Sequence, residues 1–92
     1  MFALWRRGEL HLQRGDETPA ETDFREALSV AQHIGSKAYQ LRATTSLARL
    51  LDREGKRDQA RTMLAEIYNW FTEGFDTADL IDAKALLEEL SS

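Results

Sequence analysis

Apolar residues recur every three or four positions in five stretches of the chain, and short polar segments separate these stretches. Such spacing places the apolar side chains on one face of an α-helix, so the pattern predicts five helices. The predicted helices cover residues 2–14, 19–34, 38–53, 57–73 and 76–90. The connections between them are short, which makes successive helices antiparallel neighbours.

The third predicted helix, roughly Ala38 to Arg53, is apolar over more than half of its surface. Its two apolar lines consist of Leu41, Thr44, Leu47, Ala48 and Leu51 on one side and Ala43, Leu47 and Leu50 on the other. A helix with a single stripe buries one side, so a helix with two lines should be covered from two directions. We therefore expect this helix to hold together the hairpins before and after it.

Local signals mark where the helices begin and end. The run Thr18-Pro19-Ala20-Glu21 predicts a capping box with proline at the first helical position. Ser36 is a candidate N-cap for the third helix. Glycine adopts the left-handed conformation freely, so three glycines are expected to end helices: Gly15, Gly35 and Gly74.

The spacing also predicts which side chains of the other four helices face the core. They are Leu4, Gly8, His11 and Leu12; Ala20, Phe24, Ala27, Leu28, Ala31 and Ile34; Ala60, Met63, Leu64, Ile67, Tyr68 and Phe71; and Leu80, Ala83, Leu87 and Leu90.

The chain repeats itself with a period of 40 positions, as from Gly15 to Gly55. The residues that recur are Gly8, Gly15, Ala20, Phe24 and Ala27, as Ala48, Gly55, Ala60, Leu64 and Ile67. Small residues at the first and third positions let the two helices of a hairpin approach closely, and the large residue at the fourth packs against them. The chain therefore contains two related helical hairpins.

These residues resemble the pattern of the tetratricopeptide repeat, in which a small residue, a turn glycine, alanine, a large apolar residue and alanine follow at the same spacings. The chain departs from it at Leu4 and Thr44, where tryptophan is usual, at Arg7 in place of leucine and at His11 in place of tyrosine. The period exceeds the usual length of about 34 residues. The resemblance implies a single all-α domain over residues 1–92, a short right-handed solenoid with repeats at 2–34 and 36–73 and a closing helix at 76–90.

A narrower resemblance covers residues 47–51, 68–80 and 83–87. These segments are similar to the carboxyl-terminal end of large bacterial regulators, which carry a nucleotide-cyclase or winged-helix domain, an ATPase domain and then a helical-repeat tail. The resemblance implies a tail that serves in signalling. The cyclase and ATPase domains themselves are absent from these residues, so their activities do not transfer.

Composition limits the classes of partner. The net charge of −4 argues against nucleic acid, since binding phosphates needs clustered basic charge. No apolar run has the 18 or so residues of a membrane span, and the first residues do not form a signal peptide. We therefore expect a cytoplasmic protein with a protein or peptide partner and no nucleic-acid or membrane partner.

No pattern in the chain predicts catalysis, a cofactor or a metal site. Phosphate-binding glycine loops and nucleophile motifs are missing. His11 and His33 lie on separate predicted helices, and we interpret them as a packing residue and a residue near a helix end. Asp76, Asp79 and Asp82 lack calcium-loop spacing and fit the start of a helix. We expect a protein that is not an enzyme.

One group of residues is a candidate binding surface. The resemblance implies that the first helix of each repeat lines a concave face, where four polar residues of the third helix would gather: Arg42, Thr45, Arg49 and Arg53. Arg42 and Arg49 are about two turns apart, so both side chains point to the same side of the helix. Arginine binds carboxylates with two hydrogen bonds, so this face suits an acidic peptide or a carboxyl terminus. The alternatives are a solvated face with local pairs such as Arg49 with Asp52, or an ion-pair seam in a larger stack.

The aromatic residues leave two questions open. Trp70 either packs under the closing helix with Phe75 or anchors a partner. The first helix has no helix before it, so exposed residues there form a possible surface for a second copy of the chain: Phe2, Trp5 and Glu9. Self-association is thus the alternative function.

Overall fold

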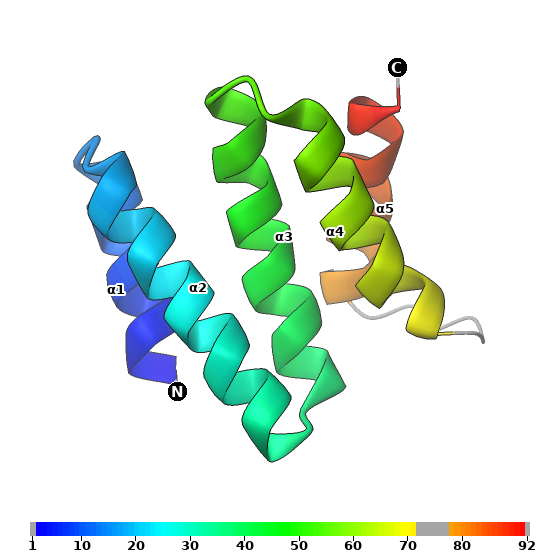
Figure 1. Cartoon of the computed structure of the whole chain (residues 1–92), viewed down its shortest axis with the longest axis horizontal. Coiled ribbons are helices and arrows are strands. Elements are labelled where there is room, and N and C mark those ends of the chain that lie inside the picture. Colours follow the sequence, from blue (N-terminus) through cyan, green and yellow to red (C-terminus); the bar gives the residue numbers. More distant parts are fainter. Residues whose placement is uncertain (1, 72–77, 92) are drawn as a thin grey trace.

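The computed structural model describes residues 2–71 and 78–91, and these form five helices. The helices are α1 (Phe2–Gln13), α2 (Glu17–Ile34), α3 (Lys37–Arg53), α4 (Arg57–Trp70) and α5 (Ala78–Leu90). Two antiparallel hairpins, α1/α2 and α3/α4, stand side by side, and α5 packs on the second of them (Figure 1). The predicted all-α architecture of hairpins and a closing helix is confirmed.

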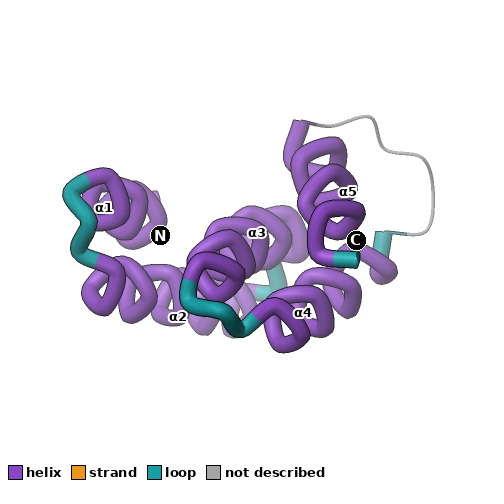
Figure 2. Tube along the Cα trace, turned by 90° about the horizontal axis from the view of Figure 1, so that it is seen from above, coloured by secondary structure: helices purple, strands orange, loops and turns teal. Residues whose placement is uncertain are grey.

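The helices form two layers. Seen from above, α2 and α4 lie on one side, whereas α1 and α5 flank α3 on the other (Figure 2). We call the side formed by α1, α3 and α5 the inner face, and the side formed by α2 and α4 the outer face. The inner face carries the candidate binding residues.

Helix α3 is the centre of the core. The Ser36 side chain caps it by accepting a hydrogen bond from the Tyr39 amide at 3.4 Å, as predicted. Its leucines 41, 47, 50 and 51 are at most 1% exposed. Helices α2, α4 and α5 all pack against it, so the expectation that it is covered from more than one direction is confirmed.

The two hairpin turns have the same hydrogen bonds, 40 residues apart. The Asp16 amide donates to the His11 carbonyl at 2.8 Å, and the Lys56 amide donates to the Leu51 carbonyl at 2.8 Å. Gly15 and Gly55 have φ of +82° and +81°, a conformation that glycine adopts at little cost. The repeat read from the sequence is therefore a repeat of structure.

A close approach holds the first hairpin together at Gly8. A Cβ atom at this position would lie 2.7 Å from Cε1 of the Phe24 ring, well inside van der Waals contact. Phe24 itself is completely buried. Glycine at position 8 thus makes room for the phenylalanine, as the repeat pattern predicts.

A polar cluster occupies the positions where the family pattern has leucine and tyrosine. Arg7 donates from Nη2 to Oδ1 of Asp23 at 2.7 Å and from Nε to both carboxylate oxygens at 3.1 Å. Asp23 is only 4% exposed, and its hydrogen bonds raise the pKa of the Arg7 guanidinium. The half-buried His11 brings Nε2 within 3.5 Å of the same carboxylate. The α1/α2 contact therefore combines apolar packing with a charge-assisted pair.

Two predicted helix boundaries are wrong. Helix α2 begins at Glu17 rather than Pro19, and Asp16 precedes it without a side-chain capping bond. Proline fits anywhere in a first turn, where its missing N–H has no helical partner, so it did not mark the first position. Helix α4 ends at Trp70 rather than residue 73, because Phe71 turns extended and packs its ring against the core. The predicted terminator Gly74 and the predicted helix start at Asp76 lie outside the described residues.

Two predicted core positions also differ. Ile34 ends α2 at the turn and is 56% exposed, so the buried stripe of α2 stops at Ala31. In α5, Leu86 is buried and Leu87 only partly so. This helix contacts both α3 and α4, and a helix wedged between two neighbours buries a broader face than one stripe.

Candidate functional site

The inner face contains a small hollow of about 60 Å³ over α3. Three helices supply its walls, and its lining residues are Trp5 and Glu9 from α1, Arg42, Thr45, Ser46 and Arg49 from α3, and Asp82 from α5. We call this surface the inner groove. It brings together three of the four predicted partner-binding residues.

A hydrogen-bonded chain fixes the wall between α1 and α3. The Trp5 indole Nε1–H donates to Oγ of Ser46 at 3.0 Å, and the Ser46 hydroxyl donates to Oε1 of Glu9 at 2.9 Å. Ser46 is 4% exposed, so its hydroxyl needs partners inside the protein. The sequence prediction missed Ser46, although its small polar side chain stands between Arg42 and Arg49 on the predicted face.

Arg42 lies on aromatic rings at one end of the inner groove. Its guanidinium carbon is 5.3 Å from the Trp5 ring centroid and 5.8 Å from that of Tyr39. Both distances are within the range of cation–π attraction. The stacking holds the charge in a fixed place, which reduces the entropy lost when a ligand pairs with it.

Arg49 is the cation most available to a ligand. It is exposed, and it makes no hydrogen bond or ion pair with any residue in the described ranges. The local pair of Arg49 with Asp52 does not form, because Asp52 pairs with Arg57 at 3.3 Å instead, whereas the exposure of Arg49 fits the alternative of a solvated face.

The other two predicted residues have internal partners. The Thr45 hydroxyl donates to the Leu41 carbonyl at 2.7 Å, and the residue is 6% exposed. Arg53 pairs with Glu17 of α2 at 3.3 Å and does not line the inner groove. Arg53 thus ties α3 to the first hairpin.

The groove also contains acidic groups that the sequence prediction did not place there. Glu9 and Asp82 stand on opposite walls, from α1 and α5. Asp82 was predicted only as a residue at the start of a helix, and its sequence neighbours gave no sign that α5 turns it toward α3. A ligand carboxylate therefore fits best in the middle of the groove, above α3.

The predicted oligomer surface is rearranged in the structure. Trp5 and Glu9 turn toward Ser46 and are partly buried, so the expectation that Trp5 is exposed is wrong. The backbone of Phe2 begins α1, but its side chain lies outside the described part of the chain. Leu10, which is 51% exposed, is instead the large apolar residue on the open side of α1.

Trp70 does not pack under the closing helix. It is 56% exposed on the outer face, where the Lys37 ammonium lies 5.4 Å from its ring centroid. Its proposed companion Phe75 lies outside the described residues. The alternative prediction, an exposed aromatic side chain, matches the position of Trp70.

Other site classes find no support in the described ranges. Within residues 2–71 and 78–91, no three histidine, cysteine or acidic side chains gather where they could hold a metal ion. None of the described helices is both long and apolar enough to cross a membrane.

Comparison with known protein families supports the repeat architecture. The family model described as the tetratricopeptide repeat matches residues 1–73, which include both hairpins. No curated protein and no solved structure matches the chain.

Proposed function

The chain belongs to the tetratricopeptide-repeat family, and from this premise we propose that it is a non-catalytic module whose inner groove binds an acidic peptide segment of a partner protein. The observation that carries the proposal is Arg49, an exposed cation that lines the groove and makes no hydrogen bond or ion pair with any described residue. Arg42 supplies a second, pre-positioned guanidinium on the same face.

The geometry supports a carboxylate ligand in particular. Guanidinium groups bind carboxylates in a planar, two-bond arrangement, and two of them on one helix face select an extended acidic segment. Glu9 and Asp82 on the walls repel acidic groups that do not lie above Arg42 and Arg49. They therefore contribute to the register in which an acidic segment binds.

We further propose that the natural setting of this module is the regulatory or scaffolding tail of a cytoplasmic bacterial signalling protein with cyclase or ATPase domains. This part of the proposal rests on the sequence resemblance over residues 47–87.

Arg49→Glu is expected to weaken binding of a fluorescein-labelled peptide of alternating glutamate and alanine by about tenfold or more, since it replaces an attraction by a repulsion. Fluorescence polarisation measures the affinity, and circular dichroism checks that the variant remains folded. Arg61→Glu on α4 is the matched control, because it changes the net charge equally on the outer face. Equal weakening by both variants, or no binding by the native chain, would contradict the proposal.

Self-association through α1 is a second candidate function, favoured by Leu10. This exposed leucine adjoins a hollow of about 360 Å³, lined also by Trp5, Arg6, Glu9 and Gln13. Its repeat equivalent, Leu50, is completely buried within the stack. A helical hairpin of a second copy is the occupant that would bury Leu10 in the same way.

The self-association hypothesis predicts a dimer whose population rises with concentration over about 1 to 100 µM. Size-exclusion chromatography with light scattering measures the mass, and Leu10→Glu should give a monomer throughout. A native chain that is monomeric over the whole range would exclude this function.

A further inference from the structure

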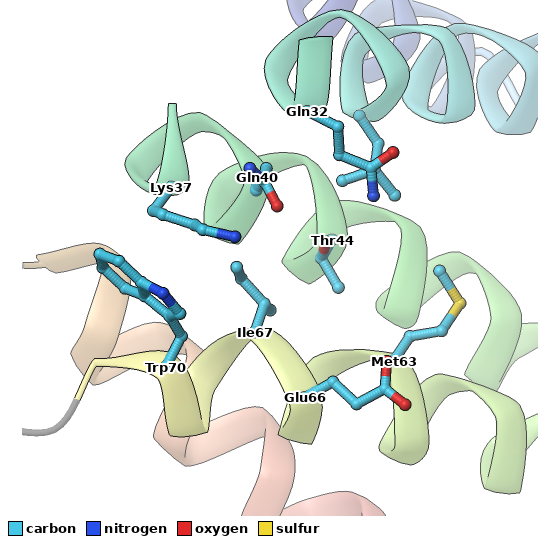
Figure 3. Close-up of a pocket in the computed structure, with 9 residues that line it drawn as sticks. Gln32, Lys37, Gln40, Thr44, Met63, Glu66, Ile67 and Trp70 are labelled. Atoms are coloured by element: carbon cyan, nitrogen blue, oxygen red, sulfur yellow. The ribbon is translucent and has the colours of Figure 1, made fainter. Parts of the chain in front are cut away.

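The outer face carries a second hollow, separate from the inner groove. It has a volume of about 250 Å³ and lies between α2 and α4, with the first half of α3 as its floor (Figure 3). We call it the outer hollow, and its polar lining residues are Gln32, Lys37, Gln40, Thr44, Glu66 and Trp70. None of these residues belongs to the inner groove.

Two buried polar side chains at its floor have no partner in the described chain. Gln40 is 7% exposed and Thr44 is 3% exposed, yet neither side chain makes a hydrogen bond with another described residue. Buried amides and hydroxyls are nearly always hydrogen-bonded, because leaving them unpaired is costly. Among the described residues, His11 Nδ1 is the only fully enclosed side-chain polar atom without a hydrogen-bond partner, so the polar atoms of Gln40 and Thr44 open onto the outer hollow, where a ligand or solvent can hydrogen-bond to them.

A charged rim surrounds this polar floor. Lys37 is partly buried, and its ammonium lies over the Trp70 ring at 5.4 Å and makes no ion pair within the described ranges. Glu66 stands toward the opposite end of the hollow, near Met63 (Figure 3). The cation is the less solvated of the two charges, so an added carboxylate gains more from Lys37 than an added ammonium gains from Glu66.

The floor and walls match the chemistry of a peptide backbone. Gln32 and Gln40 come from facing helices, and each carboxamide both donates and accepts a hydrogen bond. The hydroxyl of Thr44 does the same. Successive N–H and C=O groups of an extended chain satisfy such a mixed set, whereas an apolar ligand satisfies none of it.

We propose that the outer hollow is a second peptide site, which binds a short extended segment of a partner protein with one acidic side chain paired to Lys37. The peptide groups beside that side chain hydrogen-bond to Gln32, Gln40 and Thr44, and Trp70 covers the segment from one side. The volume is below the range of about 300–1,000 Å³ typical of small-molecule pockets, so only a few residues are accommodated.

The test is a nuclear magnetic resonance titration of the whole ¹⁵N-labelled chain with acetyl-Ala-Glu-Ala-amide. We expect saturable shifts of the Gln32 and Gln40 side-chain amides and of the Trp70 indole N–H, with a dissociation constant of about 1–10 mM. The neutral probe acetyl-Ala-Gln-Ala-amide should bind about tenfold more weakly, since it cannot form the ion pair. This comparison of the glutamate and glutamine probes uses the native chain alone and needs no variant.

Lys37→Met tests the cation, because methionine keeps an unbranched apolar stem beside Trp70. It should reduce the affinity for the glutamate probe to that for the glutamine probe. Thr44→Val, which replaces a hydroxyl by a methyl group, should weaken both probes. Lys84→Met on α5 removes an exposed ammonium that lines neither hollow, so it should change neither affinity.

Several results would overturn the proposal. Equal affinity for the two probes would exclude recognition of the acidic side chain. Free L-glutamate binding as tightly as the blocked tripeptide would identify a small-molecule site instead. An absence of shifts at about 10 mM would mean that water alone fills the hollow. The Arg49→Glu experiment tests the inner groove separately, so a negative result at one site does not contradict the proposal for the other.

Discussion

Leu47→Ala is expected to lower the free energy of unfolding by about 2–5 kcal/mol, the usual range for truncating a fully buried leucine. Leu47 is 0% exposed and lies in α3, on which α2, α4 and α5 all pack. A cavity at this point removes contacts from both hairpins at once, and three surrounding helices leave little freedom to collapse into it. Urea denaturation followed by circular dichroism measures the change.

A matched leucine provides the control for this prediction. Leu10→Ala removes the same atoms from a side chain that is 51% exposed, so it should change stability by no more than about 0.5 kcal/mol. If the two alanine variants lost similar amounts of stability, α3 would not be the centre of the core.

Gly8→Ala is expected to cost about 1–2 kcal/mol even though alanine is the better helix former. The new methyl group would lie 2.7 Å from the Phe24 ring, and overpacking of this kind costs about 1–3 kcal/mol. The gain in helix propensity, up to about 1 kcal/mol, offsets only part of that cost. Urea denaturation measures the net change.

The second hairpin indicates how to relieve the clash. It has Ala48 and Leu64 at the equivalent positions, and both are 0% exposed. The double variant Gly8→Ala, Phe24→Leu should therefore be more stable than the sum of the single changes predicts, by about 0.5–3 kcal/mol of coupling. Additive effects would show that Gly8 and Phe24 do not constrain one another.

The sequence predicted the fold well because two independent signals agreed. Helical spacing identified the elements, and the 40-residue repeat predicted their packing, including the glycine turns at residues 15 and 55. At the start of α2, the local capping pattern Thr18-Pro19-Ala20-Glu21 and the 40-residue repeat predict different first residues, and the repeat predicts the observed one. Shifting the predicted start of α4 at Arg57 back by 40 positions gives Glu17, where α2 begins.

The candidate sites were less predictable, because they depend on contacts between helices. The spacing along α3 predicted that Arg42 and Arg49 share one face, and in the structure both residues line the inner groove. It could not show that Trp5 turns inward to Ser46, or that α5 brings Asp82 to the same groove. The outer hollow could not be predicted from the sequence either, since Lys37 and Trp70 are far apart in the chain and meet only in the folded structure.

The two surfaces lie on opposite sides of α3, which gives the module a simple geometry. In the two proposed binding modes, an acidic segment at Arg49 contacts the inner layer, and a segment in the outer hollow contacts the outer layer. Both surfaces use the same helix as a floor, so its rigid packing holds both sites in shape.

The most direct test of the central proposal is to map where the glutamate–alanine peptide binds, by titrating it into the ¹⁵N-labelled chain. We expect the largest shifts at the Trp5 indole N–H, Ser46 and Arg49, which border the inner groove. Shifts confined to α2 and α4, or no shifts at saturating peptide, would contradict the central proposal.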